Sequence, residues 1–203
     1  MNSYIRIATC TIFLSVAPYC AGQDLNATIE NCNGCHGEGG VSQWDDMPTI
    51  AGIDAFTQSD ALYVYRDNER PCAESKYRTG DTSRSPVSMC DVAADLSDDD
   101  IEALAEHYSG LTFVAARQEF DAALAEKGAE IQKRECDRCH SDGGSNADDE
   151  ASILAGQWMP YLRAAFEQYA SGERPQDKKM KEKMDLLSAD DVEALLHYYA
   201  SQQ

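Results

Sequence analysis

The sequence is short of positive charge and of long apolar runs. It has 17 Lys and Arg residues against 36 Asp and Glu residues, which gives a formal net charge of −19. That imbalance argues against nucleic acid and anionic lipid as partners, because both carry negative charge. The longest apolar stretch, residues 5–17, is shorter than the roughly 20 residues that span a bilayer. No segment alternates polar and apolar residues convincingly, so we expect an all-α fold.

The N-terminus has the features of a removable export signal. Arg6 supplies positive charge at the start of the mostly apolar stretch 5–17, and small residues follow at positions 20–22. We therefore expect residues 1–22 to be a signal peptide that directs the chain to the periplasm, with no membrane span after cleavage. A transmembrane anchor and a lipid anchor on Cys20 are the alternatives, although Pro18 and Tyr19 fit a lipidation signal badly.

The chain contains an internal repeat. The sequence "NCNGCHGEGG" at 31–40 returns as "ECDRCHSDGG" at 135–144, an offset of 104 that also pairs 69–71 with 173–175, Glu-Arg-Pro in both copies. After the second proline the offset falls to 91, so the first copy carries 104 − 91 = 13 extra residues. We expect two tandem domains, 23–110 and 111–203, with an inserted loop at 72–88 in the first.

Helical patterns dominate both copies. Ser97 and Ser188 each precede acidic residues and an apolar pattern of helical spacing, which predicts a capped helix at the end of each copy. Residues 117–135 predict a long helix and residues 158–172 another, which ends at Gly172. About three helices per copy leave thin hydrophobic cores, so a large apolar group is expected to fill each domain.

The repeated C-x-x-C-H motif identifies that group as covalent haem. In this motif two thiols add to the vinyl groups of a porphyrin, and the adjacent histidine becomes the proximal ligand of the iron. Two such motifs behind an export signal predict two covalently bound haem c groups. The haem-attaching residues are Cys32, Cys35, Cys136 and Cys139, and the proximal iron ligands are His36 and His140.

Other uses of these cysteines explain the pattern less well. A zinc ribbon usually places its two C-x-x-C pairs about 15–20 residues apart, and the motifs here are about 100 apart. A thioredoxin-like redox pair would need a βαβ setting. Disulfides within each motif would be strained. Of the remaining mature cysteines, Cys72 and Cys90 flank the inserted loop, so we expect a disulfide that clamps it.

The sixth ligand of each iron is predicted to be a methionine. Met89 and Met180 occupy equivalent places, seven residues before the Leu-Ser that opens the last helix of each copy. Met47, Met159 and Met184 are competitors, and packing in the core is the ordinary role of any methionine. His107 and His197 would give bis-histidine sites, but they are not equivalent under either offset.

Several further residues are candidates for contact with the haem or its histidine. Pro48 and Ser152 lie twelve residues after the two histidines, so their carbonyl groups are placed to hold the imidazole rings. Others are candidates for contacting haem edges or propionates, with ordinary packing and solvation as the alternative: Tyr65, Arg70, Trp158, Tyr169 and Arg174.

The sequence resembles the periplasmic diheme class I cytochromes c over nearly the whole mature chain. The resemblance rests on the two C-x-x-C-H motifs, "PTIAG" and "SILAGQW", and a Met ahead of "LSDDDIEALAEHY" and "LSADDVEALLHYY". The second half is similar to the cytochrome subunit of flavocytochrome c sulfide dehydrogenase in "FDAALAEKGAEI", "ILAGQWMPYL" and "ERPQDKKMKEKM". The insertion at 72–88 departs from that subunit.

The resemblance implies a fold, a ligand set and a partner. The fold would be two cytochrome c domains related by a pseudo-twofold axis, with His/Met ligation of both irons and Met180 as the second methionine ligand. It further implies a flavoprotein partner that carries FAD and oxidises sulfide, while this chain accepts the electrons. The chain itself would carry no FAD.

Transfer of single electrons is the function that these features favour, because six-coordinate iron leaves no open site for a substrate. The chain would then not be an enzyme by itself. A free diheme shuttle to a terminal oxidase or reductase, or another periplasmic carrier, is the main alternative to a bound subunit. A diheme peroxidase, a thiosulfate-oxidising cytochrome or a gas or redox sensor would need an exchangeable ligand, for which Cys90 is the candidate.

The positive charge is unevenly placed. Residues 23–110 have 18 acids and 5 bases, a net charge of −13, whereas residues 111–203 have 18 acids and 11 bases, a net charge of −7. Five of those bases gather around Met180: Arg174, Lys178, Lys179, Lys181 and Lys183. They form either an ordinary solvated loop or a basic rim that steers a partner toward the second haem.

Overall fold

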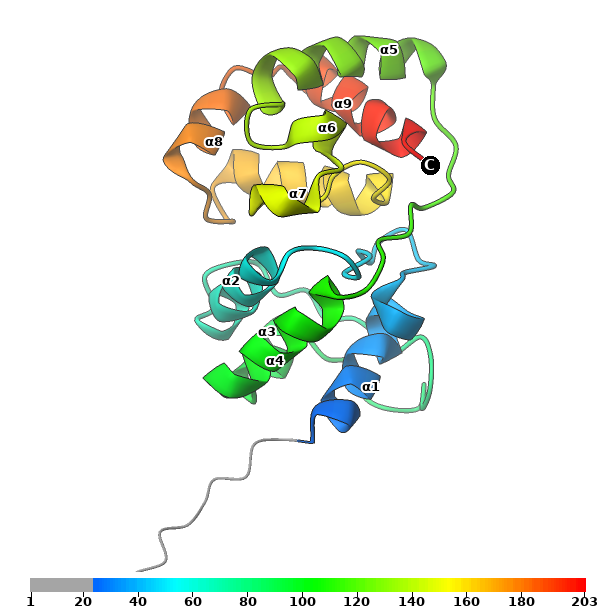
Figure 1. Ribbon diagram of the computed structural model, residues 1–203, viewed down its shortest axis with the longest axis vertical. Coiled ribbons are helices and arrows are strands. Elements are labelled where there is room, and N and C mark those ends of the chain that lie inside the picture. The colour runs from blue at the N-terminus through cyan, green and yellow to red at the C-terminus, as the bar shows by residue number, and fades with distance from the viewer. Residues whose placement is uncertain (1–23) are drawn as a thin grey trace, which may run out of the picture.

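Two groups of helices, stacked one on the other, make up the molecule (Figure 1). The computed structural model describes residues 24–203, so the expected signal peptide at 1–22 lies outside the described residues. One group contains α1 (Leu25–His36), α2 (Ala55–Arg66), α3 (Met89–Ala94) and α4 (Asp98–Ser109). The other contains α5 (Ala122–Ile131), α6 (Ser141–Gly144), α7 (Met159–Ser171), α8 (Lys178–Met184) and α9 (Ala189–Ser201).

The described chain is all-α, as the sequence predicted. Within residues 24–203, the pairing of Ser75 with Val87 is an isolated bridge inside the inserted loop, and no strand forms. No helix in this range combines the length and apolar character that crossing a bilayer requires.

Each half has a small core of its own. In the first half, Leu96, Ile101, Leu104 and Tyr108 are buried together, most of them on α4. In the second half, α5 lies against α9, and the core is formed by six residues: Ile131, Leu162, Ala194, Leu195, Leu196 and Tyr199. Gly128 allows this close approach, because a Cβ atom there would lie 2.1 Å from the carbonyl oxygen of Ala194. Residues of both halves also line a cavity between them.

The predicted helix caps are confirmed. Ser97 and Ser188 begin α4 and α9, and in each case the serine hydroxyl accepts from the backbone N–H of the acid three residues later, Asp100 or Asp191. The carboxylate of each acid in turn accepts a hydrogen bond from the backbone N–H of its serine, which completes a capping box. The helix predicted at 158–172 is also present as α7, and Gly172 ends it with a φ of 77°.

The helix predicted to start near residue 117 starts later, at Ala122. The carboxylate of Asp121 accepts hydrogen bonds from the N–H groups of Ala123 and Leu124, and the N–H of Asp121 itself donates to Nδ1 of His197. This non-local bond holds Asp121 outside the helix as its N-cap. After Ile131 the helix continues as a π-helical turn, Gln132–Cys136, into the second C-x-x-C-H motif.

No residue range was predicted for α1, α2 or α6, nor for the two short helices α3 and α8. Both carry candidate methionines, since Met89 is the first residue of α3 and Met180 lies within α8. A capping box of Ser88 and Asp91 begins α3, and Asp177 caps α8. Those caps were the sequence signal that could have revealed both helices.

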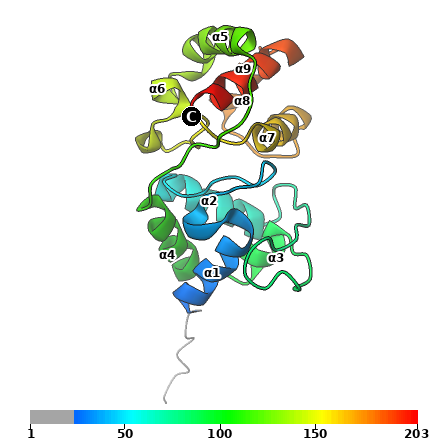
Figure 2. The same cartoon turned by 90° about the vertical axis from the view of Figure 1, so that its right-hand side faces the viewer.

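The segment 110–121 links the two halves, and the two halves also touch directly (Figure 2). The side-chain amide of Gln157 accepts a hydrogen bond from the backbone N–H of Thr49 at 3.0 Å. It also donates one to the backbone carbonyl of Thr49 at 2.9 Å. Nearby, the indole N–H of Trp158 donates to the carbonyl of Ser42, and the N–H of Tyr161 to that of Asp45. These bonds bring both C-x-x-C-H motifs to one shared cavity.

Candidate haem site

A single cavity of about 960 Å³ lies between the two halves and is lined by residues of both. That volume is at the upper end of the roughly 300–1,000 Å³ of ordinary ligand pockets. All six residues of the two motifs that were predicted to hold haem line it: Cys32, Cys35, His36, Cys136, Cys139 and His140. The two motifs are about 100 positions apart in the sequence, and the fold brings both of them to the same cavity.

The first motif forms the last turn of α1. His36 is only 7% exposed, and its Nδ1 lies 3.0 Å from the carbonyl oxygen of Pro48. Because a carbonyl can only accept, Nδ1 carries the proton, and Nε2 is left as a free nitrogen lone pair. Burial lowers the pKa of His36 below its ordinary value, against the opposing effect of the Pro48 carbonyl. The ring is therefore held neutral, which is the form that binds iron.

The second motif repeats this arrangement with different residues. Nδ1 of His140 lies 3.2 Å from the carbonyl oxygen of Ser152, and burial likewise lowers the pKa of His140. The two carbonyl partners that the twelve-residue spacing predicted are thus confirmed. The buried amide of Gln132 adds a contact by donating to the carbonyl of His140.

None of the four motif cysteines is part of a disulfide. Before haem is attached, burial raises the pKa of the Cys32 thiol to about 11. No disulfide forms within either motif. In the part of the chain that the structure describes, no three His, Cys, Asp or Glu side chains are grouped so as to hold a metal ion, as a zinc ribbon would need.

Four methionines line the cavity: Met47, Met89, Met180 and Met184. Met47 adjoins Pro48, whose carbonyl bonds the His36 ring, so it lies on the histidine side of the first site. Met89 comes from α3, a separate element, and is half-buried. Met159 is not part of the lining, and its sulfur accepts a hydrogen bond from Arg163.

The two remaining histidines lie outside the lining. His197 accepts from the N–H of Asp121 and pairs with Glu193 at 3.3 Å, and the ring of His107 packs edge-on against Tyr108. Both side chains contact neighbouring protein groups from their helices, which is the ordinary role of a helix residue.

Cys72 and Cys90 form a disulfide, with a Cα–Cα distance of 5.7 Å. It ties the start of the inserted loop to the second residue of α3, directly beside Met89. Inside the loop, Tyr77 is buried against Gly34 of α1, where an added Cβ would lie 2.7 Å from its ring. The insertion is therefore packed onto the helix that carries the first motif.

Sequence reasoning missed the residues that join the halves. Gln157 is 1% exposed and spans 108 positions to Thr49, and nothing in the local pattern marks either residue as paired. Tyr161 was also missed, although it lines the cavity beside two residues that were candidates for haem contact, Arg70 and Arg174. Tyr65 and Tyr169 were candidates as well; the guanidinium groups of Arg70 and Arg174 stack on their rings.

The residues that line the cavity fit haem c. Each half offers two thiols separated by two residues, a neutral imidazole with Nε2 free, and a methionine on another element, around a largely apolar space. When bound, haem iron supplies one-electron chemistry, and the surrounding side chains set its potential.

Known proteins resemble this chain over most of its length. Residues 123–198 match the family model described as cytochrome c oxidase, cbb3-type, subunit III. A protein named thiosulfate dehydrogenase electron acceptor, from Stutzerimonas stutzeri (strain A1501), is 30% identical over 188 residues, which cover 87% of this chain and 81% of that protein.

Two solved structures have the same fold. Reduced recombinant cytochrome c4 from Pseudomonas stutzeri superposes with a TM-score of 0.69 at 25% identity, covering 90% of this chain and 100% of the other. The thiosulfate dehydrogenase TsdBA from Marichromatium purpuratum, in its as-isolated form, superposes with a TM-score of 0.66 at 25% identity. That match covers 85% of this chain and 36% of the other.

Together, the fold, the cavity and these matches define a protein of two tandem cytochrome c domains that transfers electrons. The chain belongs to the diheme class I cytochrome c family, and its cofactors are covalently bound haem c groups. These matches do not show a specific closeness to the cytochrome subunit of sulfide dehydrogenase, and the relative from Stutzerimonas stutzeri is named a thiosulfate dehydrogenase electron acceptor.

Proposed function

We propose that this chain is the diheme electron acceptor of a thiosulfate-oxidising dehydrogenase, and that it works in the periplasm after loss of residues 1–22. The single observation that supports the role in electron transfer is the shared cavity. Both C-x-x-C-H motifs line it, and each histidine is held neutral with its Nε2 free. The thiosulfate part rests on what the relative is named.

The proposal assigns a role to each site residue. Cys32 and Cys35 bind the first haem through thioether bonds, and Cys136 and Cys139 bind the second. His36 and Met89 ligate the first iron, and His140 and Met180 the second. With a histidine and a methionine assigned to each iron, neither haem would offer a free coordination position to a substrate, so the chain would pass single electrons and would not be an enzyme by itself.

Replacing the methionines one at a time tests this ligand set. Met89→Ala and Met180→Ala should each abolish half of the near-infrared charge-transfer band between methionine sulfur and ferric iron. Each should also lower the potential of one haem, because a thioether favours ferrous iron. Met159→Ala is the matched control, since Met159 lies outside the cavity lining. Loss of the band in Met47→Ala or Met184→Ala instead would reassign the ligand.

The electron donor is tested by reconstitution. The purified diheme protein is mixed with a thiosulfate dehydrogenase and thiosulfate, or with a flavoprotein sulfide dehydrogenase and sulfide, and reduction is followed in the haem absorption bands. Reduction in the first mixture at a rate that saturates with the donor enzyme supports the proposal. Fast reduction only in the second mixture would favour the flavoprotein partner that the second half resembles. Reduction in neither would favour a free shuttle with another donor.

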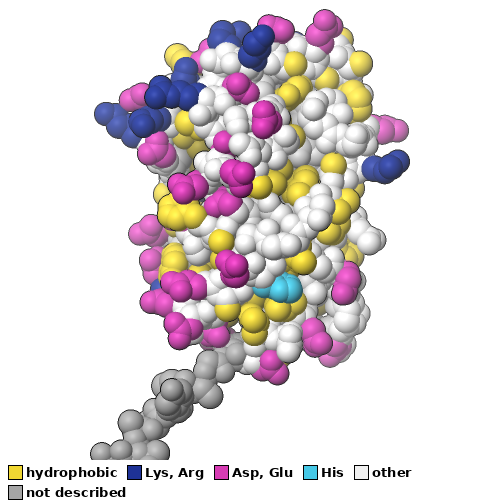
Figure 3. Space-filling view, in the orientation of Figure 1, with side chains coloured by type: hydrophobic (Ala, Val, Ile, Leu, Met, Phe, Trp, Pro, Cys, Tyr) yellow, Lys and Arg dark blue, Asp and Glu magenta, His cyan; other side chains and the backbone are white. Residues whose placement is uncertain are grey.

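We further propose that α8 is the docking surface for an acidic partner. Figure 3 shows Lys and Arg side chains gathered where α8 lies, while Asp and Glu dominate the lower half of that face. Lys181 pairs with Asp185 and Lys183 with Glu135, whereas Lys178 is exposed with no ion pair among the described residues. Met180 on the same helix lines the cavity, so a partner bound there would lie close to the second haem.

Charge reversal tests the docking surface. Lys178→Glu should slow electron transfer from the donor at low salt and have little effect at high salt, because screening removes long-range steering. Arg117→Glu makes the same change of charge on the linking segment and is the matched control. Equal rates for the two variants at low salt would exclude docking at α8.

A further inference from the structure

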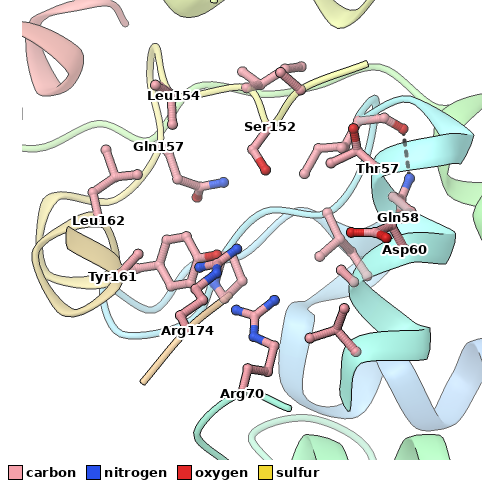
Figure 4. A pocket seen from close by; sticks show the side chains of 18 of the residues that line it. Thr57, Gln58, Asp60, Arg70, Ser152, Leu154, Gln157, Tyr161, Leu162 and Arg174 are labelled. Carbon is pink, nitrogen blue, oxygen red and sulfur yellow. Dashed lines mark hydrogen bonds between the residues drawn. The ribbon is translucent and has the colours of Figure 1, made fainter. Parts of the chain in front are cut away.

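The inserted loop at 72–88 covers the first C-x-x-C-H motif. It lies beside α1 (Figure 1), and the sulfur of Cys35 is 3.8 Å from the carbonyl oxygen of Lys76 in the loop. Figure 4 shows part of the haem cavity from close by. Three residues of the loop belong to the lining of that cavity: Ser75, Tyr77 and Val87. The loop therefore reaches the cavity on the side where the first pair of cysteines lies.

Hydrogen bonds fix the loop to the two residues between these cysteines. The backbone N–H groups of Arg78 and Thr79 both donate to the carbonyl of Gly34, at 2.7 Å and 3.1 Å. The hydroxyl of Thr79 donates to the carbonyl of Asn33 at 2.9 Å. The contact is thus made largely by backbone groups, which hold the loop in one position on the motif.

A glycine between the cysteines allows the loop to come this close. A Cβ atom at Gly34 would lie 2.7 Å from the ring of Tyr77, which is only 7% exposed. The Cζ atom of Arg84 lies 3.8 Å from the centre of the same ring, and its guanidinium donates to the side chain of Asn31 at 2.8 Å. Tyr77 is therefore held both by α1 and by the rest of the loop.

The second motif is open instead. Under the repeat offset of 104, the residue equivalent to Gly34 is Arg138, which is exposed. Cys139 is also exposed, whereas Gly34 is buried and Cys35 is partly buried. In place of the inserted loop the second copy has only the four residues 176–179. The insertion therefore makes the two motifs unequal in their access to solvent.

This difference affects the haems because of where the thioether bonds are made. The edge of each haem that is bonded to cysteine must lie at its own motif. Protein packed over such an edge keeps out water and holds a redox partner at a greater distance. An edge that faces solvent can be approached directly. The two haems are then unequal in their exchange of electrons with a partner.

The charges around the two motifs differ in the same sense. Three exposed bases lie in or just before the second motif: Lys133, Arg134 and Arg138. The equivalent residues of the first copy carry no positive charge: Ile29, Glu30 and Gly34. Glu135 pairs with both Arg134 and Lys183, which joins α8 to the second motif. The open motif and α8 therefore form one surface whose charge suits an acidic partner.

We propose that the inserted loop closes the cysteine edge of the first haem to redox partners. An acidic redox protein then exchanges electrons at the open cysteine edge of the second haem, and the first haem is reached through the second. This inference rests on the proposed function, in which each C-x-x-C-H motif holds one haem. The loop is thus a specificity element that selects which haem a partner meets.

Paramagnetic relaxation in the fully reduced, haem-loaded protein tests the closure. The probe is a neutral, soluble gadolinium chelate, so the unequal charges of the two halves do not bias its approach. Proton resonances of the thioether substituents are assigned to the two haems through their contacts with Cys35 or Cys139. In the wild type, the relaxation enhancement should be several-fold larger at the second haem than at the first. Equal enhancement at both haems would overturn the proposal.

A loop exchange removes the cover. Residues 72–88 are replaced by Gln-Asp-Lys-Lys, the residues 176–179 of the second copy, which gives Met89 the spacing that Met180 has. Cys90→Ser is included because the exchange removes its disulfide partner. Relaxation enhancement at the first haem should then rise to the level of the second. The rate constant for reduction by a neutral flavin semiquinone should rise toward twice the wild-type value, since two edges are accessible in place of one.

Tyr77→Ala is a second test that leaves the length of the loop unchanged. It should raise the enhancement at the first haem alone, by less than the loop exchange does. Tyr63→Ala is the matched control, because Tyr63 is also stacked by an arginine of the first half, Arg66, but lies outside the cavity lining. If the loop exchange does not load both haems, Tyr77→Ala decides. An enhancement at the first haem no larger than in Tyr63→Ala would refute the closure.

The result is separable from that of the proposed function. Haem content and the methionine–iron band are measured on every variant. A wild-type protein with fewer than two haems would overturn the function itself. Two haems with intact ligands and equal access to the chelate would refute only the closure by the inserted loop.

Discussion

One buried side chain makes two of the hydrogen bonds between the halves, and replacing it should lower the stability of the protein measurably. Gln157 is 1% exposed. Its Oε1 accepts from the N–H of Thr49 at 3.0 Å, and its Nε2 donates to the carbonyl of Thr49 at 2.9 Å. Thr49 is also 1% exposed, so neither of its backbone groups has access to bulk water when the amide is removed.

The size of the effect follows from these two bonds. A buried backbone group left without a partner costs about 1–3 kcal/mol, so Gln157→Ala should lower the free energy of unfolding by about 2–6 kcal/mol. Water that enters the space left by the side chain would move the result toward the lower end. Gln157→Met keeps most of the volume and removes both bonds, so it should lose a similar amount if hydrogen bonding is the cause.

Urea unfolding of the haem-loaded protein, followed by far-ultraviolet circular dichroism, measures the change. Gln43→Ala is the matched control, because Gln43 is exposed and makes no hydrogen bond among the described residues. A loss for Gln157→Ala within about 0.5 kcal/mol of the Gln43 control would refute the reasoning, since that is the range of ordinary surface substitutions. Full stability in Gln157→Met would show that volume is what matters.

Three further predictions concern local features. Replacing both Cys72 and Cys90 by serine should lower unfolding stability by about 3 kcal/mol, because the disulfide closes a loop with a sequence separation of 18; thermal unfolding with and without reductant measures it. Gly156→Ala should destabilise more than Gly172→Ala in the same assay. Both glycines have positive φ, but only at Gly156 would the new Cβ meet other atoms, at 2.6 Å. The pKa of Asp191 is held below its ordinary value by hydrogen bonds from its capping serine. The stabilisation it gives is therefore present above its unfolded pKa of about 3.9 and is lost as the pH falls through the lower folded pKa. The stability of Asp191→Asn should fall less than that of the wild type between about pH 5 and pH 2, and an identical acid profile would contradict this.

The local features of the fold could be predicted from the sequence because their partners lie close along the chain. A C-x-x-C-H motif is five consecutive residues, and each capping box joins Ser97 or Ser188 to an acid three positions later. The repeat offset placed Pro48 and Ser152 twelve residues after their histidines, and both carbonyls do hold the rings. The partners lie only three to twelve residues apart along the chain in each case.

Features that join distant segments were decided by packing. The start of α5 moved from residue 117 to 122 because Asp121 donates to His197, 76 positions away. Local propensity contains no information about that partner, since the bond exists only when α5 lies on α9. The short helices α3 and α8 were overlooked for a related reason: six or seven residues are stable as helices only when packed against their neighbours.

The sequence by itself determined the candidate residues for the chemistry of this protein: two thiol pairs, two histidines and two methionines at equivalent places, all identified by spacing within each copy. Only the tertiary structure decided how the two copies share one cavity, with Gln157 bonded to Thr49 and Arg70 facing Arg174. The physical reason is that side chains about 100 positions apart acquire a fixed distance only when both halves are folded and docked.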